Sequence, residues 1–588
     1  MSSITRFSIV TLLLFVLSIV FVIRPLHVPL RLPYFGRRRF PINLTTAPII
    51  IIAILWASQC LGATQIRNGI VGVDDVKPYN ILILFFSLAY MAITLDVTGL
   101  LQAAAFWVSN KGGTHGWRLY VYFYLLLTIV SVVVGNDPVI LSGTVFLVYY
   151  TNAIGLEPLP WLMAEFLAAN TASMVLFVGN PTNVVVCEGF AIINAAFTAY
   201  TILPFLACSV FGFLAMAIQF RDQKHIPRKF PSAGTLNVRG ALHDPISALV
   251  GSIILGACLV VIIVTSFFGV DVWKISLPFA VAKFGFDMSW DHYRYKKGKR
   301  NPDIEDNEHK PGDASTGAGY ELENSNGGDD PVLSEIRRAV TVSSAEGFRT
   351  PAVDRKSTIA SNSPTLLNRE AVGITRAAGI DDGPPSPSQS SGATRADNDS
   401  SPPPLFPKQR AHLRKIHARL SRHFPTFFTA LPRLPFALVP FAFSQFILIE
   451  ALSHQGWIEV FARWLVSATG REIHPSIWLV GVLGVVLCNI SGTNIGATIL
   501  LTKVVRAAPD FPPEATRAAG IALAVSTNIG AVGATFSASL AGLLWASILE
   551  QKGIHIKQRT FAFWNFFPIV VMTVVGLGVV SAEMAVLY

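Results

Sequence analysis

The chain has 588 residues, of which 52% are hydrophobic and only 14% are charged, and its mean hydropathy is +0.51. Repeated apolar runs of about 18 residues or more in so long a chain are typical of a polytopic helical membrane protein and exclude a soluble enzyme. The formal net charge of +10 does not indicate nucleic-acid binding, because Lys and Arg gather in the connections between apolar runs, as in cytosolic loops of membrane proteins.

Residues 1–79 are predicted to form an N-terminal pair of transmembrane helices. The apolar run 8–23 follows Arg6 and ends without a small-residue cleavage site, so it is interpreted as a retained span and not as a signal peptide. A second span is expected at 47–63. The connection between the two spans is rich in arginine and is therefore expected in the cytosol.

Residues 80–220 are predicted to form the first of two transport repeats. A span at 80–108 is followed by an apolar run at 119–150, which is interrupted at 135–138. The interruption leaves arms of about 12 to 15 residues, too short to cross a bilayer core, so a re-entrant hairpin is favoured over two spans. A helix at 161–195, interrupted at 179–183, and a span at 198–220 complete this repeat.

The two interruptions, Gly-Asn-Asp-Pro at 135–138 and Gly-Asn-Pro-Thr-Asn at 179–183, lie deep within apolar sequence. A broken helix leaves backbone groups unpaired, which a bilayer tolerates only where protein or a polar cavity covers them. Either break alone could be a kink made by proline and glycine. Two breaks rich in amide and hydroxyl groups are better explained as parts of a binding site.

Residues 221–294 are predicted to contain connecting transmembrane helices. A basic cluster follows residue 220 and is expected in the cytosol, and a strong span is expected at 244–269. The segment 272–290 is short and contains Lys274, Lys283 and Asp287, so its crossing is left open.

Residues 295–406 are predicted to be a disordered cytosolic connection, because this polar, Pro- and Gly-rich segment cannot bury enough apolar surface to fold. Segment 407–425 is predicted to be a basic amphipathic helix on the anionic cytosolic leaflet. Leu413, Ile416 and Leu420 recur there at helical spacing, and lysines and arginines fill the other face. An ordinary solvated helix would show the same pattern.

Residues 426–588 repeat the order of the first unit. Counted from a cytosolic first loop, the second repeat starts on the side opposite to the first, provided that 272–290 crosses. The predicted fold is therefore an all-α polytopic membrane protein of about 10 spans plus 2 hairpins, with two inverted-topology repeats that each contain a re-entrant helical hairpin and a broken transmembrane helix. The segments of the second repeat are 435–465, 477–506 broken at 489–494, 517–549 interrupted by Ser526-Thr527-Asn528 and the small-residue run 530–541, and 561–587.

These segments resemble the ion transporter superfamily. The resemblance is carried by Asn-Asp-Pro at 136–138, Gly-Leu-Glu-Pro-Leu-Pro at 155–160, Ala-Glu-Phe-Leu-Ala-Ala-Asn-Thr-Ala-Ser at 164–173 and Gly-Asn-Pro-Thr-Asn at 179–183. They look most like the branch that holds ArsB-type arsenite pumps, NhaD-type sodium/proton antiporters, the melanosomal P protein and citrate transporter-like proteins. Ser-Leu-Ala-Gly-Leu-Leu-Trp at 539–545 is similar to the matching segment of the arsenite pumps. The resemblance implies an elevator or rocking carrier in which two hairpins and two unwound helices surround one site.

The resemblance also suggests substrate- and ion-binding residues, by their position at the hairpin tips and the unwound helices. Dicarboxylate carriers of the superfamily have Ser-Asn-Thr at both tips, and this chain does not, which argues against dicarboxylate transport. The residues suggested are Asn136, Asp137, Asn180, Thr182, Asn183, Asn489, Ser491, Thr493, Asn494, Thr527 and Asn528.

Neutral amide and hydroxyl groups can replace water around a cation, and helix N-termini can hold an anion or a neutral oxyacid, so such a site fits either. Asp137 is the exception, since a carboxylate at membrane depth is by default a proton or cation carrier, although Asp137 would also suit a helix cap. Asp96 and Glu450, at corresponding places in the two repeats, are further candidates for proton coupling. Glu165 and Glu188 are not assigned, because either could pair near an interface. No catalytic residue, metal site or cofactor is predicted beyond Na+ or H+ as coupling ion.

The predicted function is secondary active transport of a small ion, either arsenite or another inorganic anion or a citrate-like organic anion, coupled to H+ or Na+. An anion channel or a Na+/H+ antiporter on the same scaffold is the alternative. An enzyme is disfavoured, because His-Glu-x-x-His, Gly-x-Ser-x-Gly and a phosphate-binding loop are all absent from the sequence. The multi-pass chain is expected in the plasma membrane or an internal organelle membrane, with the lipid bilayer and a small ion as partners and no nucleic acid. The sequence names neither the substrate, the coupling ion nor the oligomeric state, for which related carriers suggest a homodimer.

Overall fold

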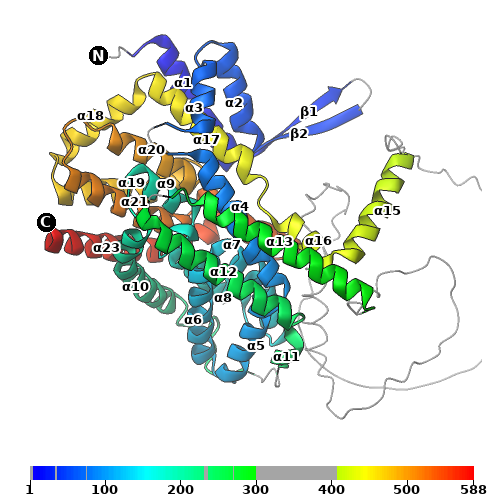
Figure 1. The fold of residues 1–588 in the computed structure, drawn as a ribbon. Helices are drawn as coiled ribbons and strands as arrows, with labels where there is room; N and C mark the ends of the chain where they lie inside the picture. Colours follow the sequence, from blue (N-terminus) through cyan, green and yellow to red (C-terminus); the bar gives the residue numbers. More distant parts are fainter. Residues whose placement is uncertain (1–3, 33–35, 74–75, 231–235, 269, 299–406) are drawn as a thin grey trace, which may run out of the picture. The chain divides into compact units, whose positions relative to one another are not determined.

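The computed structural model describes residues 4–32, 36–73, 76–230, 236–268, 270–298 and 407–588. The connection predicted at 295–406 therefore lies almost entirely outside the described residues. Apart from loops and one two-stranded sheet, the described chain is helical (Figure 1).

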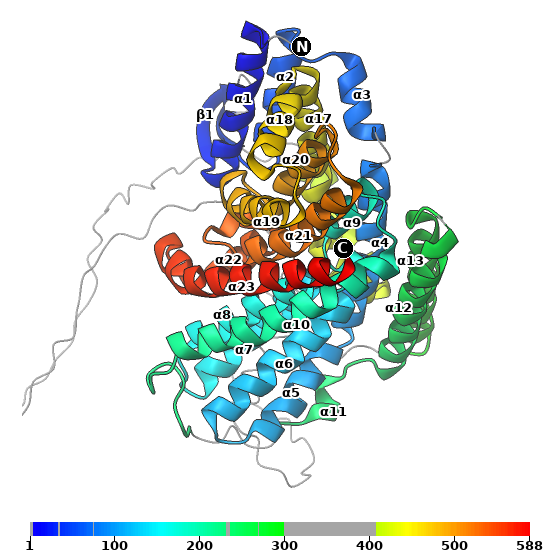
Figure 2. The same ribbon diagram turned by 90° about the vertical axis from the view of Figure 1, so that its left-hand side faces the viewer.

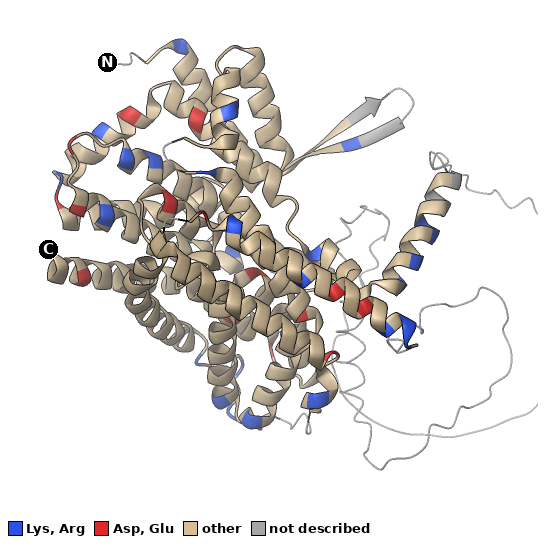
Figure 3. Ribbon diagram, viewed as in Figure 1, with Lys and Arg blue, Asp and Glu red and all other residues tan. Residues whose placement is uncertain are grey.

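Eight helical segments of the described chain are long and apolar enough to cross a membrane, so the protein is a polytopic membrane protein. Figure 3 shows that most of the helical ribbon carries no Lys, Arg, Asp or Glu. The eight segments are fewer than the predicted total of about 10 spans, because some predicted spans are short or fall below the required hydropathy. The eight segments are Arg6–Ile23, Pro78–Val97, Gly116–Val134, Asn194–Gln219, Pro245–Phe268, Pro425–His454, Ile473–Ile490 and Gln558–Leu587.

The N-terminal region contains a β-hairpin that the sequence prediction did not include. In it, β1 (Leu26–Leu32) pairs antiparallel with β2 (Gly36–Ile42), and Leu26 lies opposite Ile42. Apolar residues at every second position of β1 favour a strand. The predicted span at 47–63 is a 12-residue helix, which at the usual helical rise is about 18 Å long. The helices of this region are α1 (Arg6–Ile23), α2 (Thr46–Ala57) and α3 (Ala63–Val71).

Two segments predicted as continuous are each split by a glycine. The turns lie at Gly99, with a φ of 83°, and at Gly456, with a φ of 79°, a left-handed conformation that glycine adopts without steric cost. The prediction of one continuous helix was therefore wrong at both places, because a single glycine inside a helical pattern does not by itself indicate a turn. The four helices are α4 (Pro78–Val97) and α5 (Leu100–Gly112), then α17 (Leu438–His454) and α18 (Trp457–Thr469).

The interruption predicted at 135–138 is confirmed as a break between α6 (Gly116–Val134) and α7 (Asn136–Ala153). Gly135 alone separates the two helices and has a φ of 85°. The helices contain 19 and 18 residues, so the prediction of shorter arms was wrong. Because the break takes only one residue, arm length does not favour a re-entrant hairpin over two spans.

Two broken helices are buried on almost every side. Nearly all residues of α8 from Pro160 onward and of α21 from Ala518 onward are buried, as in helices at the centre of a bundle. The helices α10 and α23 lie side by side (Figure 2). The segments concerned are α8 (Pro158–Ala172), η1 (Phe177–Gly179), α9 (Pro181–Gly189) and α10 (Asn194–Gln219), then α21 (Pro513–Val532), η5 (Phe536–Ala538), α22 (Leu540–Gln551) and α23 (Gln558–Leu587).

The break in the second of these helices lies within the predicted small-residue run 530–541 and not at the predicted 526–528. Ser526, Thr527 and Asn528 are inside α21, which continues to Val532. The chain unwinds only afterwards, through 533–539. Polar side chains in the middle of an apolar helix were taken for the break itself, although their side chains can bond within the helix.

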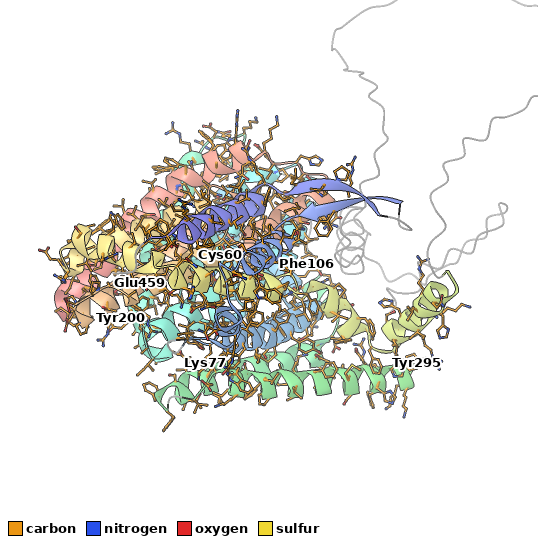
Figure 4. All side chains as sticks on the ribbon, turned by 90° about the horizontal axis from the view of Figure 1, so that it is seen from above. Cys60, Lys77, Phe106, Tyr200, Tyr295 and Glu459 are labelled. Carbon is orange, nitrogen blue, oxygen red and sulfur yellow. The ribbon has the colours of Figure 1, made fainter. Side chains whose placement is uncertain are left out.

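The segment predicted at 272–290 is the longer helix α13 (Trp273–Lys296), which is not among the eight long apolar segments. It packs on α4, where Tyr90 Oη donates to Asp287 Oδ2 at 3.0 Å. Figure 4 shows Lys77 and Tyr295 near the two ends of α13. The other helices are α11 (Val238–Ala241), α12 (Pro245–Thr265), η2 (Ser266–Phe268), α15 (Pro407–His423), α16 (Pro425–Ala430), η4 (Leu431–Arg433), α19 (Ile473–Ile490) and α20 (Asn494–Arg506).

Candidate functional site

The first broken helix unwinds between Ala172 and Pro181 for local reasons. Gly179 passes so close to Ser173 that a Cβ atom there would lie 2.4 Å from the Ser173 carbonyl oxygen, so only glycine fits. Pro181 then starts α9 at a position where no backbone N–H is needed. Asn180 caps α9, because its Oδ1 accepts from the Thr182 backbone N–H at 3.2 Å.

Asn528 of α21 meets this break and joins the two halves of the chain. Its Nδ2 donates to Asn183 Oδ1 at 2.7 Å, and its Oδ1 accepts from Asn180 Nδ2 at 3.2 Å and from Ser173 Oγ at 3.0 Å. All four side chains are buried, with exposed fractions of 0% to 3%. The arrangement is a closed set of neutral hydrogen-bonding groups at the centre of the bundle, called here the asparagine cluster: Ser173, Asn180, Asn183 and Asn528.

Asn183 also stabilises the unwound backbone itself. Its Nδ2 donates to the carbonyl oxygens of Ser173 at 2.8 Å and Leu176 at 2.9 Å. The Leu176 carbonyl also accepts from the Gly179 N–H at 2.9 Å, whereas Ser173 lies where α8 ends, and a buried carbonyl without a partner is costly. The break is therefore a built feature of the fold.

The second break is held in a similar way by another asparagine. Asn489, at the end of α19, accepts with its Oδ1 from the backbone N–H groups of Ala534 at 2.7 Å and Thr535 at 3.2 Å. Ser539 caps α22, because its Oγ accepts from the Gly542 N–H at 3.0 Å. Asn489 thus contacts the second break and not the asparagine cluster.

The turn between α6 and α7 contacts the first break. Asn136 Nδ2 donates to Asn170 Oδ1 of α8 at 3.3 Å, and a Cβ on Gly135 would lie 3.6 Å from the Gly179 carbonyl oxygen. In the turn between α19 and α20, Thr493 Oγ1 accepts from the Gly496 N–H at 3.3 Å, and Ser491 donates to the Thr493 carbonyl at 3.2 Å. Each turn therefore lies against the broken helix of its own half.

The structure brings together only some of the residues suggested by the sequence. Asn180, Asn183 and Asn528 meet directly, whereas Thr527 donates to the Ala524 carbonyl of its own helix at 3.3 Å. Thr182 Oγ1 is buried without a partner among the described residues. Asn494, which begins α20, is also buried. Sequence reasoning missed Asn170, Ser173 and Ser539, and their signal was a polar residue next to a break in apolar sequence.

The three carboxylates proposed for coupling differ in their partners. Arg433 donates to Asp96 at 3.1 Å, and Lys503 donates to Glu450 at 2.7 Å, so both carboxylates are neutralised by a cation. Asp137, in the first turn of α7, has no ion-pair partner within the described chain. Asp137 is therefore the one of the three whose charge is not already balanced.

The electrostatics of the breaks come from helix ends. Helix α7 begins at the buried Asn136, and the buried residues Asn180, Thr493 and Ser539 cap the N-termini of α9, α20 and α22. Helix N-termini carry unpaired N–H groups and partial positive charge, which favour an anion or an oxyacid. No group of three or more His, Cys, Asp or Glu among the described residues is arranged to hold a metal ion.

A separate cavity of about 410 Å³ lies beside α4, α5, α6 and α7. Its polar wall includes Asp96, Ser142 and Arg433, while Phe123, Phe146 and other apolar residues of α6 and α7 form much of the rest. None of the asparagine cluster lines it. The cavity thus borders α7, and no residue of α8 lines it.

Comparison with known proteins points to transporters. Residues 32–295 match the family model described as citrate transporter. An arsenical pump membrane protein of Yersinia enterocolitica is 27% identical over 249 residues, which cover 40% of this chain and 57% of that protein. An arsenical pump membrane protein of Escherichia coli is 26% identical over 265 residues, covering 41% and 61%, and an uncharacterized transporter of Mycobacterium tuberculosis is 22% identical over 191 residues, covering 31% and 44%. The chain thus spans less than two thirds of the length of these relatives.

Proposed function

We propose that this chain, whose residues 32–295 belong to the citrate transporter family, is a secondary carrier for a small inorganic anion or neutral oxyacid of the arsenite class, coupled to H+ or Na+. The observation that carries the proposal is the asparagine cluster, in which Asn528 of α21 bonds Asn180 and Asn183 of α9. There the break that precedes α9 meets α21, a buried helix from the other half of the chain, inside a membrane protein. Such meeting points are where secondary carriers bind their substrates.

The order of elements supports two repeats. In each half, a helix turns at a left-handed glycine, two helices follow around a polar turn, a buried helix breaks, and a long helix ends the unit. The residues that restart the broken helices have matching backbone angles, with φ and ψ of −147° and 141° at Asn180 and −145° and 156° at Ser539. Similar backbone at equivalent places is expected of an internal duplication. The second unit is inverted relative to the first only if α13 crosses the membrane.

Burial favours a carrier over a channel. Asn183 and Asn528 have exposed fractions of 0%, so no open path passes through the asparagine cluster in this conformation. A carrier requires such an occluded site and exposes it alternately to the two sides. A channel would instead require a continuous polar path.

The groups at the breaks favour a small oxyacid over a citrate-like anion. The asparagine cluster is uncharged, and helix N-termini supply only partial positive charge. A tricarboxylate would require several cationic partners to offset its desolvation. A neutral or singly charged oxyacid can be held by amide and hydroxyl groups alone, and two of the similar proteins are arsenical pump membrane proteins.

Transport by purified protein in liposomes tests the proposal. Arsenite, phosphate, citrate, chloride and sodium would be offered singly under imposed pH and sodium gradients. We expect saturable arsenite or inorganic-anion flux that depends on one gradient, and loss of that flux in Asn528→Ala but not in the exposed control Asn152→Ala. Non-saturating currents would favour a channel, sodium flux against protons without anion flux would favour an antiporter, and citrate as sole substrate would contradict the oxyacid assignment.

A further inference from the structure

Helix α8 carries a carboxyl group whose setting differs from that of the other buried acids. Glu165 has an exposed fraction of 0%. Its Oε2 accepts from Thr144 Oγ1 of α7 at 3.0 Å, while its Oε1 has no hydrogen-bond partner among the described residues. No Lys, Arg or His nitrogen of the described chain forms an ion pair with it.

The contrast with the paired acids is informative. Asp96, Glu450 and Asp287 each contact a cation, respectively Arg433, Lys503 and Lys283. A buried carboxylate without such a partner carries a desolvation cost of several kcal/mol, and the group avoids that cost by holding a proton. The arrangement around Glu165 therefore suits the neutral acid, with the proton on the oxygen that lacks a partner.

A glycine gives this oxygen a route to the cavity beside α7. A Cβ atom on Gly143 would lie 2.4 Å from Glu165 Oε1, so any larger residue would displace the carboxyl group. Gly143 and its neighbour Ser142 line the 410 Å³ cavity, whose wall also includes the Asp96–Arg433 ion pair. Gly143 therefore lies against both Oε1 and a cavity with room for water.

The other titratable groups on helices packed against α8 have different partners or positions. Tyr120 donates to the Pro160 carbonyl, Tyr124 donates to the Ser209 carbonyl, and Tyr150 accepts from Ser109. Asp137 lies two turns before Thr144 on α7, about 10 Å along the helix axis. The charged residues of α6, α21 and α22 lie near the ends of these helices, and none contacts Glu165.

Glu165 is also connected to the candidate substrate site through α8. Asn170, five residues later on the same helix, accepts from Asn136, and Ser173 follows at the start of the break. Ionisation of Glu165 would change the contact with Thr144 that holds α7 against α8. Asn136 begins α7 and Ser173 of the asparagine cluster follows α8. A proton at Glu165 and a substrate at the first break would therefore both affect the contact between α7 and α8.

We infer that Glu165 is the proton-binding site of this protein. Water in the cavity delivers a proton to Oε1 past Gly143, and in another conformation Oε1 returns the proton to water by the same route. The O–H bond that forms at Oε1 converts the carboxylate to the acid, and it replaces an O–H bond of a hydronium ion, which becomes water. Release of the proton is the reverse of this step. The role in coupled transport rests on the proposed function, whereas the protonation itself does not.

Infrared spectroscopy of the purified protein, recorded as the pH is raised, tests the proton site without any substrate. We expect a protonated-carboxyl band in the wild-type protein that is missing in Glu165→Gln and unchanged in Glu550→Gln, whose side chain is exposed. Gly143→Ala should retain the protonated-carboxyl band, although its Cβ pushes the carboxyl group aside, and should slow the hydrogen–deuterium shift of that band at least tenfold. An unchanged band in Glu165→Gln overturns the site, and an unchanged exchange rate in Gly143→Ala overturns the route.

Liposome transport then separates this inference from the proposed function. Glu165→Gln should retain exchange of substrate between the two sides, yet lose at least tenfold of the flux driven by a pH gradient. A variant with wild-type dependence on the pH gradient overturns the coupling role. If the wild-type protein transports no substrate while its infrared band behaves as expected, the proposed function fails and the proton site stands.

Discussion

Asparagine side chains account for most of the polar contacts at the two breaks. An amide both donates and accepts, so one uncharged residue can satisfy a freed carbonyl and a freed N–H group at membrane depth. Asn183 satisfies carbonyls of the first break, and Asn489 satisfies N–H groups of the second. Asp137 differs, because it is a carboxylate without an ion-pair partner in the described chain.

Replacement of Asn489 by alanine is expected to destabilise the second break. The N–H groups of Ala534 and Thr535 would lose their shared acceptor, at a cost of about 1–3 kcal/mol in the free energy of unfolding. Thermal unfolding in detergent measures this loss. Asn489→Asp keeps an acceptor oxygen and should lose less, and equal unfolding midpoints for the wild type and Asn489→Ala would contradict the capping role.

Replacement of Asp137 by asparagine tests the coupling role that the sequence suggested. If Glu165 binds the proton, Asp137→Asn should transport with unchanged dependence on pH. Any role of Asp137 as a cation ligand should then appear as weaker dependence on sodium, because the variant removes the negative charge and keeps the shape. Substrate flux measured as a function of pH and of sodium concentration distinguishes the two roles. Loss of the pH dependence alone would show that Asp137, and not Glu165, binds the coupled proton.

At the scale of elements, breaks could be predicted wherever glycine, proline or asparagine interrupts an apolar run. The breaks at 135–138 and 489–494 were found in this way. Gly99 and Gly456 were not recognised as turns, because a single glycine is compatible with a helical pattern and apolar sequence resumes after each of them. Asn528 was placed in the break, whereas it is helical and reaches across to Asn183. Long-range pairing of this kind leaves no local pattern in a sequence.

The first break should be intolerant of a side chain at Gly179. The Cβ of Gly179→Ala would lie 2.4 Å from a backbone oxygen, so the break must shift, at a cost of about 1–3 kcal/mol and with loss of transport. Gly256→Ala is the matched control, because no atom lies within 4 Å of its Cβ and alanine favours helix. Unfolding midpoints and flux are measured for both, and normal transport by Gly179→Ala would show that the geometry of the break is unimportant.

The buried ion pair of α13 offers another test at this scale. Lys283 contacts Asp287, and Tyr90 of α4 donates to the same carboxylate. Lys283→Met leaves that carboxylate without its cation and should cost about 3–5 kcal/mol, whereas Lys283→Met with Asp287→Leu should recover most of the loss. Chemical unfolding of both variants measures the difference. A double variant as unstable as the single one would show that the pair contributes more than charge compensation.

At the scale of the whole molecule, the proposed function depends on two halves that meet with opposite orientation. The asparagine cluster shows that residues about 350 positions apart in sequence share one buried site. Contact alone is compatible with parallel or inverted units. Inversion matters because it alone makes the two conformations of a carrier equivalent in structure and open to opposite sides.

Equivalent helix starts in the two halves can be compared for the side on which they lie. His115 precedes α6 and Glu472 precedes α19, and both are exposed and form no side-chain cap. The native cysteines are all buried, so single replacements His115→Cys and Glu472→Cys can be labelled in intact cells with a membrane-impermeant maleimide. With inverted units, one variant should be labelled from outside and the other only after the membrane is opened. Labelling of both variants from the same side would show that α13 does not cross the membrane or that the two units are parallel. A carrier with symmetry-related conformations would then be excluded.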